Sequence, residues 1–292
     1  MFPTLTPRLF PLLSTVALAA AMLTGTAAHA ACMSDAEVTR LMASQQVRRQ
    51  AETPAGLSAA DAACSRAKFN ALLEAKMGRP VGYKAGLTNP AVQKRFQATE
   101  PVWGALYAPM LLKDGAIVDP AFGARPLFEA DMLVRVSDVR VNQARTPEDV
   151  LQSIDQVIPF IELPDLMVDT PAKINGAVLT AVNVGARHGV VGTPVPVQRT
   201  AEFANALRDV QIVISGNGAE LDRGKGADVL EHPLNAVVWL AQALKADGRS
   251  LKVGDVVSLG SFSKLMPPKP GLAVEVRYNG LPGNPSVRMQ FR

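Results

Sequence analysis

The stretch RPLFEADMLVRV, residues 125–136, alternates its side chains as a β-strand does and carries two acids two positions apart. Successive side chains of a strand point to opposite faces, so Glu129 and Asp131 share one face with Leu133 and Arg135. Two carboxylates placed in this way can converge on one cation. Periodicity alone, however, favours a simpler interpretation, in which the strand turns one face to solvent.

A third acid, Glu162, lies in VIPFIELPDL, residues 157–166, where its neighbours are apolar and prolines bound the run. A buried charge without a partner costs several kcal/mol, so this acid needs a binding partner. Glu129, Asp131 and Glu162 together are therefore candidate ligands of a hard cation. Ligands that are all carboxylate oxygens favour Mg²⁺ or Mn²⁺, and they also suit Ca²⁺.

The other metal-binding side chains do not suit zinc. One of the three histidines lies within the first thirty residues, and His188 in ARHGVVG and His232 in LEHP occur in turn-like stretches. We interpret both as surface residues. No cluster of cysteine and histidine has the spacing of a zinc site.

Length and composition predict a compact globular protein. The chain has 292 residues, 48% hydrophobic and 19% charged, which argues against a disordered chain. The formal net charge of +4 falls to +3 when the first thirty residues, which contain Arg8, are set aside, and no basic block follows. Nucleic acid is therefore not expected as a partner.

The first thirty residues have the pattern of a secretory signal peptide. Arg8 precedes an apolar stretch over residues 9–23, and Ala28 and Ala30 form an A-x-A pattern around His29. We predict cleavage after Ala30 and a periplasmic or secreted protein that is free of the membrane after cleavage. Two alternatives stay open: a membrane anchor, although the run is shorter than the roughly 20 residues of a spanning helix, and a lipidated Cys32.

The chain has two cysteines, Cys32 and Cys64. If the protein is exported, they can form a disulfide, because disulfides persist in oxidising compartments. A disulfide between them is the simplest prediction, and two free, buried cysteines are the alternative. The patterns SDAE at 34–37 and SAAD at 58–61 are typical of capping boxes that begin helices. Gly78 is expected to end the second helix, so the bridge would join the two.

The rest of the chain alternates short strands with turns. A helix is predicted from TPED at 146–149, with a second over 232–248 and a pair of closing strands around YNGLPGNP at 278–285. The first of these helices has apolar positions at Val150, Leu151, Ile154, Val157 and Ile158. Strands that outnumber helices and are irregularly interspersed with them favour the α+β class. We therefore expect an N-terminal helical segment over 31–80 and a main domain over 81–292.

Five motifs resemble the 2-keto-4-pentenoate (2-hydroxypentadienoate) hydratases of the fumarylacetoacetate hydrolase superfamily. They are GYKAGLT at 82–88, FEADMLV at 128–134, PFIELPD at 159–165, GKGADVLEHPLNAVVWLAQAL at 224–244 and LGSFSKLMPPKPG at 259–271. The resemblance runs from about residue 55 to the C-terminus. It implies a mixed β-sheet rolled into a barrel-like fold with peripheral helices, a catalytic domain over 81–292, and usually a homo-oligomer.

The resemblance also implies a site and a reaction. Glu129, Asp131 and Glu162 would bind Mg²⁺ or Mn²⁺, with Asp131 standing where the family usually has Glu. Lys84 would be catalytic and substrate-binding, and a turn of Gly260 and Ser261 would line the pocket, with Ser261 acting in catalysis. The expected substrate is a 2-hydroxy-2,4-dienoate or 2-keto-4-enoate, to which water is added to give a 4-hydroxy-2-oxo acid.

Three alternatives to the hydratase stay open. Superfamily members that hydrolyse carbon–carbon bonds generally place a histidine upstream of the metal strand, and residues 31–129 contain none, which disfavours hydrolysis. Decarboxylases of the same branch share the acidic triad. An exported protein that binds an oxo acid without turning it over is the third, because Asp131 is one methylene shorter than Glu.

Overall fold

The computed structural model describes residues 1, 3 and 32–292. The predicted signal peptide and its cleavage site therefore lie outside the described residues. Among the helices of the described part, none is both long and apolar enough to cross a bilayer.

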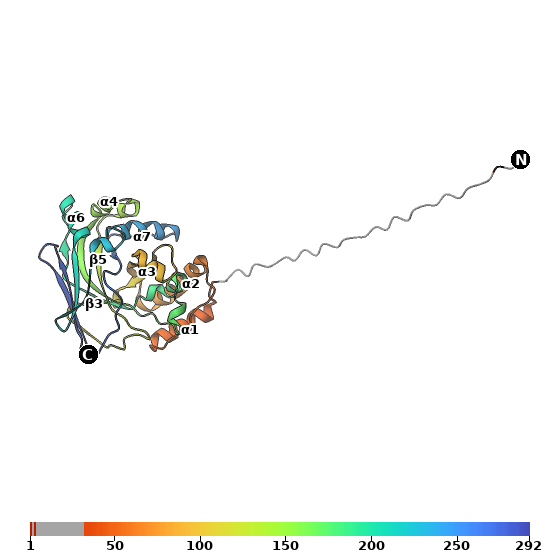
Figure 1. The fold of residues 1–292 in the computed structure, drawn as a ribbon, viewed down its shortest axis with the longest axis horizontal. Helices are drawn as coiled ribbons and strands as arrows, with labels where there is room; N and C mark the ends of the chain where they lie inside the picture. Colours follow the sequence, from red (N-terminus) through yellow and green to blue (C-terminus); the bar gives the residue numbers. More distant parts are fainter. Residues whose placement is uncertain (2, 4–31) are drawn as a thin grey trace.

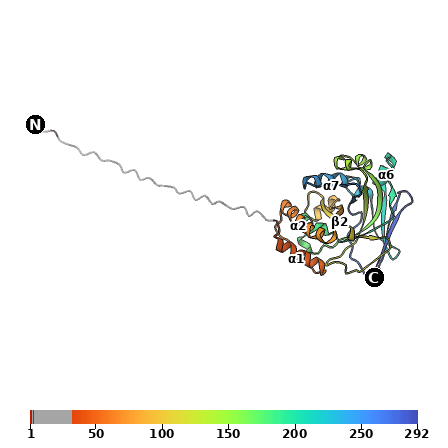
Figure 2. The same cartoon turned by 180° about the vertical axis from the view of Figure 1, so that it is seen from behind.

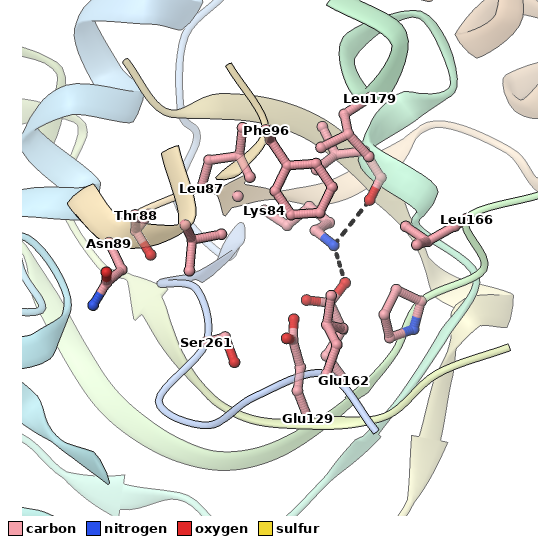
Figure 3. Close-up of a pocket in the computed structure, with 15 residues that line it drawn as sticks. Lys84, Leu87, Thr88, Asn89, Phe96, Glu129, Glu162, Leu166, Leu179 and Ser261 are labelled. Carbon is pink, nitrogen blue, oxygen red and sulfur yellow. Dashed lines mark hydrogen bonds and ion pairs between the residues drawn. The ribbon is translucent and has the colours of Figure 1, made fainter. Parts of the chain in front are cut away.

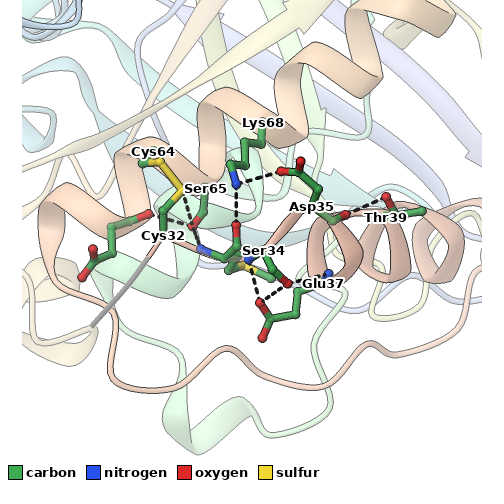
Figure 4. Close-up of polar contacts among 10 residues, drawn as sticks. Cys32, Ser34, Asp35, Glu37, Thr39, Cys64, Ser65 and Lys68 are labelled. Carbon is green, nitrogen blue, oxygen red and sulfur yellow. Dashed lines mark hydrogen bonds and ion pairs between the residues drawn. A yellow bond between two sulfur atoms is a disulfide. The ribbon is translucent and has the colours of Figure 1, made fainter. Parts of the chain in front are cut away.

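Two N-terminal helices, α1 (Asp35–Gln46) and α2 (Ala59–Met77), begin at the predicted capping boxes. Ser34 and Ser58 each accept a hydrogen bond from the backbone N–H three residues on, and the acid at that position closes the box. Gly78, with φ +82°, ends α2. The disulfide between Cys32 and Cys64 is confirmed, with Cα atoms 5.6 Å apart, and it ties the segment before α1 to α2 (Figure 4).

One mixed sheet has eight strands in the order β2-β1-β11-β5-β6-β7-β3, with β8 pairing to β6. Strands β5 and β6 are antiparallel neighbours at its centre, and β1 pairs in parallel with β11. The strands are β1 (Pro80–Gly86), β2 (Val102–Tyr107), β3 (Leu111–Lys113), β5 (Glu129–Val136), β6 (Ile154–Leu163), β7 (His188–Val191), β8 (Val195–Pro196) and β11 (Val256–Ser258).

A second sheet has five strands in the order β10-β9-β12-β13-β4. Its strands are β4 (Ala116–Val118), β9 (Gln211–Gly216), β10 (Ala219–Lys225), β12 (Ala273–Asn279) and β13 (Ser286–Phe291). The fully buried Tyr278 joins the two sheets, because its hydroxyl bonds to the backbone of Phe160 and to the carbonyl of Asp131. Tyr278 of the second sheet therefore holds β5 and β6 in place through their backbones.

The remaining helices are short and peripheral. In Figures 1 and 2, α1, α2 and α3 lie beside the curved strands, and α4, α6 and α7 gather at one end. These elements are α3 (Pro90–Arg95), α4 (Pro147–Leu151), α5 (Gly176–Ala181), α6 (Ala201–Asp209) and α7 (Asn235–Ala246), with 3₁₀ turns at Ala108–Met110, Val139–Gln143, Pro171–Lys173, Asn183–Gly185 and Gly226–Asp228. The predicted α+β class, with a mixed and curled sheet, is confirmed.

The predicted helix that begins at TPED is too long, because it was expected to include Ile154, Val157 and Ile158. It ends at Leu151, and the three residues belong to strand β6. Isoleucine and valine favour the extended backbone, and the antiparallel pairing with β5 buries them. Tertiary pairing therefore overrides the helical spacing that these positions also satisfy.

Candidate active site

Strand pairing brings the predicted acids to one region. Glu129 and Glu162 are direct partners across β5 and β6, and Asp131 lies two residues further along the same face of β5. Their exposed fractions are 8% for Glu129, 3% for Glu162 and 0% for Asp131. The interpretation of this face of β5 as solvated is therefore wrong. Asp131 is enclosed by Ser258 and Gly260 at the end of β11, and Glu129 and Glu162 lie in the lining of the pocket described below.

Lys84 of β1 meets this cluster although β11 and β5 lie between β1 and β6 in the sheet. Its ammonium forms a buried ion pair with the Glu162 carboxylate and donates a second hydrogen bond to the carbonyl of Val184, at 3.1 Å (Figure 3). Lys84 itself is only 3% exposed. The lysine is thus part of a buried charge network.

Asp131 is held differently from the two glutamates. One of its oxygens accepts a hydrogen bond from the Ser258 hydroxyl at 2.5 Å, and the other accepts from the backbone N–H groups of Gly260 at 3.1 Å and Met132 at 2.5 Å. These contacts tie β5 to the turn after β11. Asp131 is therefore directed toward Ser258 and Gly260 and does not line the pocket described next.

Gly260 has a structural reason to be glycine. Its φ is +103°, and a Cβ there would lie 2.0 Å from the hydroxyl oxygen of Thr88. The close approach brings the following residue, Ser261, to the pocket, although Gly260 does not itself line it. Of the predicted turn, Ser261 lines the pocket, and Gly260 provides the left-handed backbone conformation that precedes it.

The pocket has a charged floor and apolar walls. Lys84, Glu129, Glu162 and Ser261 lie in it together, and Figure 3 shows the two glutamates on one side, Leu87, Phe96 and Leu179 on the other, and the lysine between. The remaining lining residues are Gly86, Thr88, Asn89, Val92, Pro164, Leu166, Val184 and Leu265. The arrangement can bind a small anionic molecule that also has an apolar part.

Burial makes the acids costly to ionise. The pKa of Glu129 is raised well above its ordinary value by burial first and by the neighbouring Glu162 charge second, and Lys84 opposes this rise. The pKa of Asp131 is also raised well above its ordinary value, by burial and then by Glu162. One lysine therefore does not offset the charge of three ionised acids in this region, and a divalent cation would stabilise their ionised forms.

The donor set fits such a cation in kind, because carboxylate oxygens are the ligands that hard divalent cations prefer. Within residues 32–292, however, no three acidic, histidine or cysteine side chains are arranged as a complete ligand set. The reason lies in Asp131, whose carboxylate is taken by Ser258 and Gly260. Glu129 and Glu162 face the pocket and are the residues that would hold the ion, with Asp131 as the acid beside them.

One contributor to the site was not predicted. Asn183, Val184 and Gly185 have φ values of +54°, +53° and +63°, an uncommon left-handed conformation for a β-branched residue such as Val184. The Asn183 side chain holds this turn by accepting from the Ala105 N–H at 2.7 Å and donating to the Ala105 carbonyl at 3.0 Å. The turn presents the Val184 carbonyl to Lys84. An Asn-x-Gly sequence signals a turn, but not this contact.

The two histidines differ from their interpretation as surface residues. His188 begins strand β7, is half-buried beside Phe122 and Arg187, and has its pKa lowered to about 4, by burial first and by Arg187 second. His232 does lie in a turn, but its ring is partly buried and bonds the backbone of Ala204 and Leu234. Neither residue lines the pocket.

Comparisons of the sequence with family models and with known proteins point to the same family. Residues 86–284 match the family model "Fumarylacetoacetate (FAA) hydrolase C-terminal". The chain is 32% identical to the 2-keto-4-pentenoate hydratase of Paraburkholderia xenovorans (strain LB400) over 217 residues, 73% of this chain and 76% of that protein. It is 30% identical to a 4-oxalocrotonate decarboxylase of Pseudomonas putida over 216 residues, 74% of this chain and 79% of that protein.

A solved structure is similar over most of the chain. The 4-oxalocrotonate decarboxylase from Pseudomonas putida G7, complexed with magnesium and adipate, superposes with a TM-score of 0.78 and 25% identity, covering 88% of this chain and 97% of that one. The family model covers more than half of the 292 residues. The chain therefore belongs to the fumarylacetoacetate hydrolase family.

Proposed function

We propose that the protein is a divalent-metal-dependent hydratase that adds water to a 2-hydroxy-2,4-dienoate, or its 2-keto-4-enoate form, to give a 4-hydroxy-2-oxo acid. The observation that carries the proposal is the buried pair of Lys84 and Glu162 beside Glu129, at the floor of a pocket with apolar walls. The 32% identity to proteins named 2-keto-4-pentenoate hydratase supports it.

The proposed cation is Mg²⁺ or Mn²⁺, held by Glu129 and Glu162 with Asp131 as the third acid. When bound, such an ion supplies Lewis-acid stabilisation of negative charge on the substrate's 2-oxygen. Solved relatives described as complexes with magnesium, calcium and manganese support a divalent metal. The shorter side chain of Asp131 predicts weaker binding than three glutamates would give.

Lys84 is proposed as the donor that orients the substrate. An ammonium has three N–H donors, and Glu162 and the Val184 carbonyl accept two of them. The third is free for the substrate's carboxylate or 2-oxygen. Because burial holds the lysine in place, this donor is already oriented before the substrate enters.

The reaction has two balanced steps. The proton of the 2-hydroxyl moves to C5, and the dienol becomes a 2-oxo acid with one double bond between C3 and C4. Water then adds its oxygen to C4 and a proton to C3. Ser261 lines the pocket next to Glu129, and its hydroxyl donates to the carbonyl of Ser263 and accepts from the Ser263 N–H. The remaining lone pair of this hydroxyl is proposed to accept a hydrogen bond from the attacking water.

A decarboxylase is the second candidate. One relative named 4-oxalocrotonate decarboxylase is 30% identical to the chain, and a solved 4-oxalocrotonate decarboxylase superposes with a TM-score of 0.78. The two reactions differ in their products, since a decarboxylase releases carbon dioxide and a hydratase retains every carbon. A protein that binds an oxo acid without turning it over is the third possibility.

Export and self-association are also part of the proposal. The signal-peptide pattern of residues 1–30 supports a periplasmic or secreted location, and the Cys32–Cys64 disulfide is typical of oxidising compartments. Cell fractionation with the full-length chain tests the first point. Light scattering on the purified protein tests the expected homo-oligomer.

The function is tested by the ultraviolet absorbance of a 2-hydroxy-2,4-dienoate. Purified protein with Mg²⁺ or Mn²⁺ should remove this absorbance, and a chelator should stop the loss. Lys84→Met and Ser261→Ala should slow it, whereas Lys252→Met, an exposed lysine outside the pocket lining, should not. Unchanged absorbance with both metals and with substrates of several chain lengths would contradict the proposal.

A further inference from the structure

We propose that the pocket selects substrates whose far end is uncharged and apolar and rejects those that end in a second carboxylate. The inference rests on the proposed function, because it concerns the substrate of the same site.

The polar and apolar lining residues lie on different sides of the pocket. A substrate whose carboxylate lies at Lys84 and the glutamates must direct its other end away from that floor. Figure 3 shows Leu87, Phe96 and Leu179 facing the acids from across the pocket, with Leu166 at its side. The apolar lining is completed by Val92, Pro164, Val184 and Leu265.

The apolar wall opposite the acids consists of well-packed core residues. Leu87 and Phe96 are each 9% exposed and Leu179 is 4% exposed, and all three pack in the hydrophobic core. They come from the end of β1, the end of α3 and helix α5, so three separate elements converge on the same space. An alkyl end placed there would be stabilised by removal of apolar surface from water.

The pocket has no cation for a second carboxylate. Of the residues that line it in the described part of the chain, Lys84 is the one basic residue, and it is already paired with Glu162. Arg95 lies 5.7 Å from the centre of the Phe96 ring, but it is exposed and outside the lining. A second carboxylate in the pocket would thus lose its hydration without gaining an ion pair.

The polar groups at the edge of the wall do not replace that cation. The Asn89 side chain donates to the carbonyl of Asp228 at 3.1 Å and accepts from the N–H of Ala91 at 2.9 Å. Its amide is therefore committed to the start of α3. The two pocket glutamates lie on the opposite side and offer no counter-charge to a carboxylate at the apolar wall.

Two saturated acids of equal length give a binding test that does not depend on turnover. With saturating Mg²⁺, the affinity for 2-oxohexanoate should exceed that for 2-oxoadipate by about tenfold or more in calorimetric titrations, which corresponds to roughly 1.4 kcal/mol. Equal affinity, or tighter binding of the dicarboxylate, would overturn the inference. Selective binding of 2-oxohexanoate by a protein that turns over no dienoate would support it while contradicting the hydratase.

A cation placed in the apolar wall should reverse the preference. Leu166 and Leu265 are half-buried lining residues, so Leu166→Arg and Leu265→Arg can reach the pocket with little disturbance of the core. At least one should lower the ratio of the two affinities about tenfold or more, by strengthening 2-oxoadipate binding. Val139→Arg, at an exposed valine outside the lining, is the matched control. Unchanged ratios in both folded pocket variants would overturn the inference.

Discussion

Lys84 and Glu162 form an ion pair that is almost fully buried, with each side chain 4% exposed. A buried pair of this kind contributes little compared with an apolar pair, but loss of one partner leaves a charge that water cannot reach. The pair therefore links the stability of the fold to the chemistry of the pocket. The lysine is also the one basic residue among those that line the described pocket, where it lies with Glu129 and Glu162.

Lys84→Met should lower the free energy of unfolding of the metal-free protein by about 3 to 5 kcal/mol, because the buried Glu162 carboxylate loses its counter-charge. Glu162→Gln should cost less, since it also removes the repulsion that raises the pKa of Glu129. Urea unfolding measures both values. Lys68→Met, which breaks the exposed pair with Asp35, is the control and should cost about 1 kcal/mol or less. Equal losses for Lys84→Met and the control would contradict this account.

Metal binding should depend on the pocket glutamates. We expect Glu129→Gln and Glu162→Gln to raise the Mg²⁺ or Mn²⁺ concentration at which the protein gains half of its thermal stabilisation by about tenfold or more, because each removes a charged ligand. Glu148→Gln, at an exposed acid of α4, should leave it unchanged. The proposed cation site is wrong if all three variants respond to metal like the wild type.

The turn at Asn183 should affect catalysis by positioning Lys84. Asn183→Ala removes the two hydrogen bonds to Ala105 that hold the left-handed turn, so the Val184 carbonyl should no longer fix the lysine. The expected result is a fall in kcat of about 10 to 100-fold with a smaller change in KM. Asn175→Ala, which removes only the cap of α5, should lower stability and leave kcat unchanged. Equal effects of the two variants on kcat would show that Asn183 has only a structural role.

The disulfide should stabilise the N-terminal segment. Cys32 and Cys64 are separated by 32 positions, and closing a loop of that length contributes about 3 to 4 kcal/mol in the chain-entropy model. The double variant Cys32→Ser/Cys64→Ser should lose roughly this amount in urea unfolding, and reduced wild type should behave like it. Identical unfolding of reduced and oxidised wild type would contradict the prediction.

Acid should destabilise the protein partly through His188. Its folded pKa, about 4, lies below its ordinary value of 6.5, so the folded protein binds this proton less well than the unfolded chain does. The resulting stability is complete above about pH 6.5 and is lost as pH falls toward about 4. His188→Asn should therefore make the melting temperature fall less steeply over that range. A slope equal to that of the wild type would refute this role.

Much of the local structure follows from short sequence patterns. The capping boxes at Ser34 and Ser58 and the helix end at Gly78 depend on neighbouring residues, so the sequence alone predicts them. The common face of Glu129 and Asp131 follows from strand alternation in the same way. Which strand lies opposite and what covers that face are tertiary matters: Glu129 pairs with Glu162, and Ser258 and Gly260 enclose Asp131.

The incorrect predictions also concern features that depend on contacts between distant parts of the chain. Ile154, Val157 and Ile158 satisfy helical spacing, but pairing with β5 places them in a strand. The contacts of Asp131 with Ser258 and of Lys84 with Val184 span 127 and 100 positions in the chain. No local pattern encodes such distant contacts, so the sequence predicts the chemistry of these residues better than their geometry.

The most direct test of the central claim is the mass of the product formed from a 2-hydroxy-2,4-dienoate in ¹⁸O-labelled water with Mg²⁺ or Mn²⁺. The account predicts a 4-hydroxy-2-oxo acid that retains every carbon and carries a labelled oxygen at C4, distinguished by fragmentation from the exchangeable 2-oxo oxygen, and Lys84→Met should form it far more slowly. A substrate recovered unchanged, or a product one carbon shorter, would contradict the account.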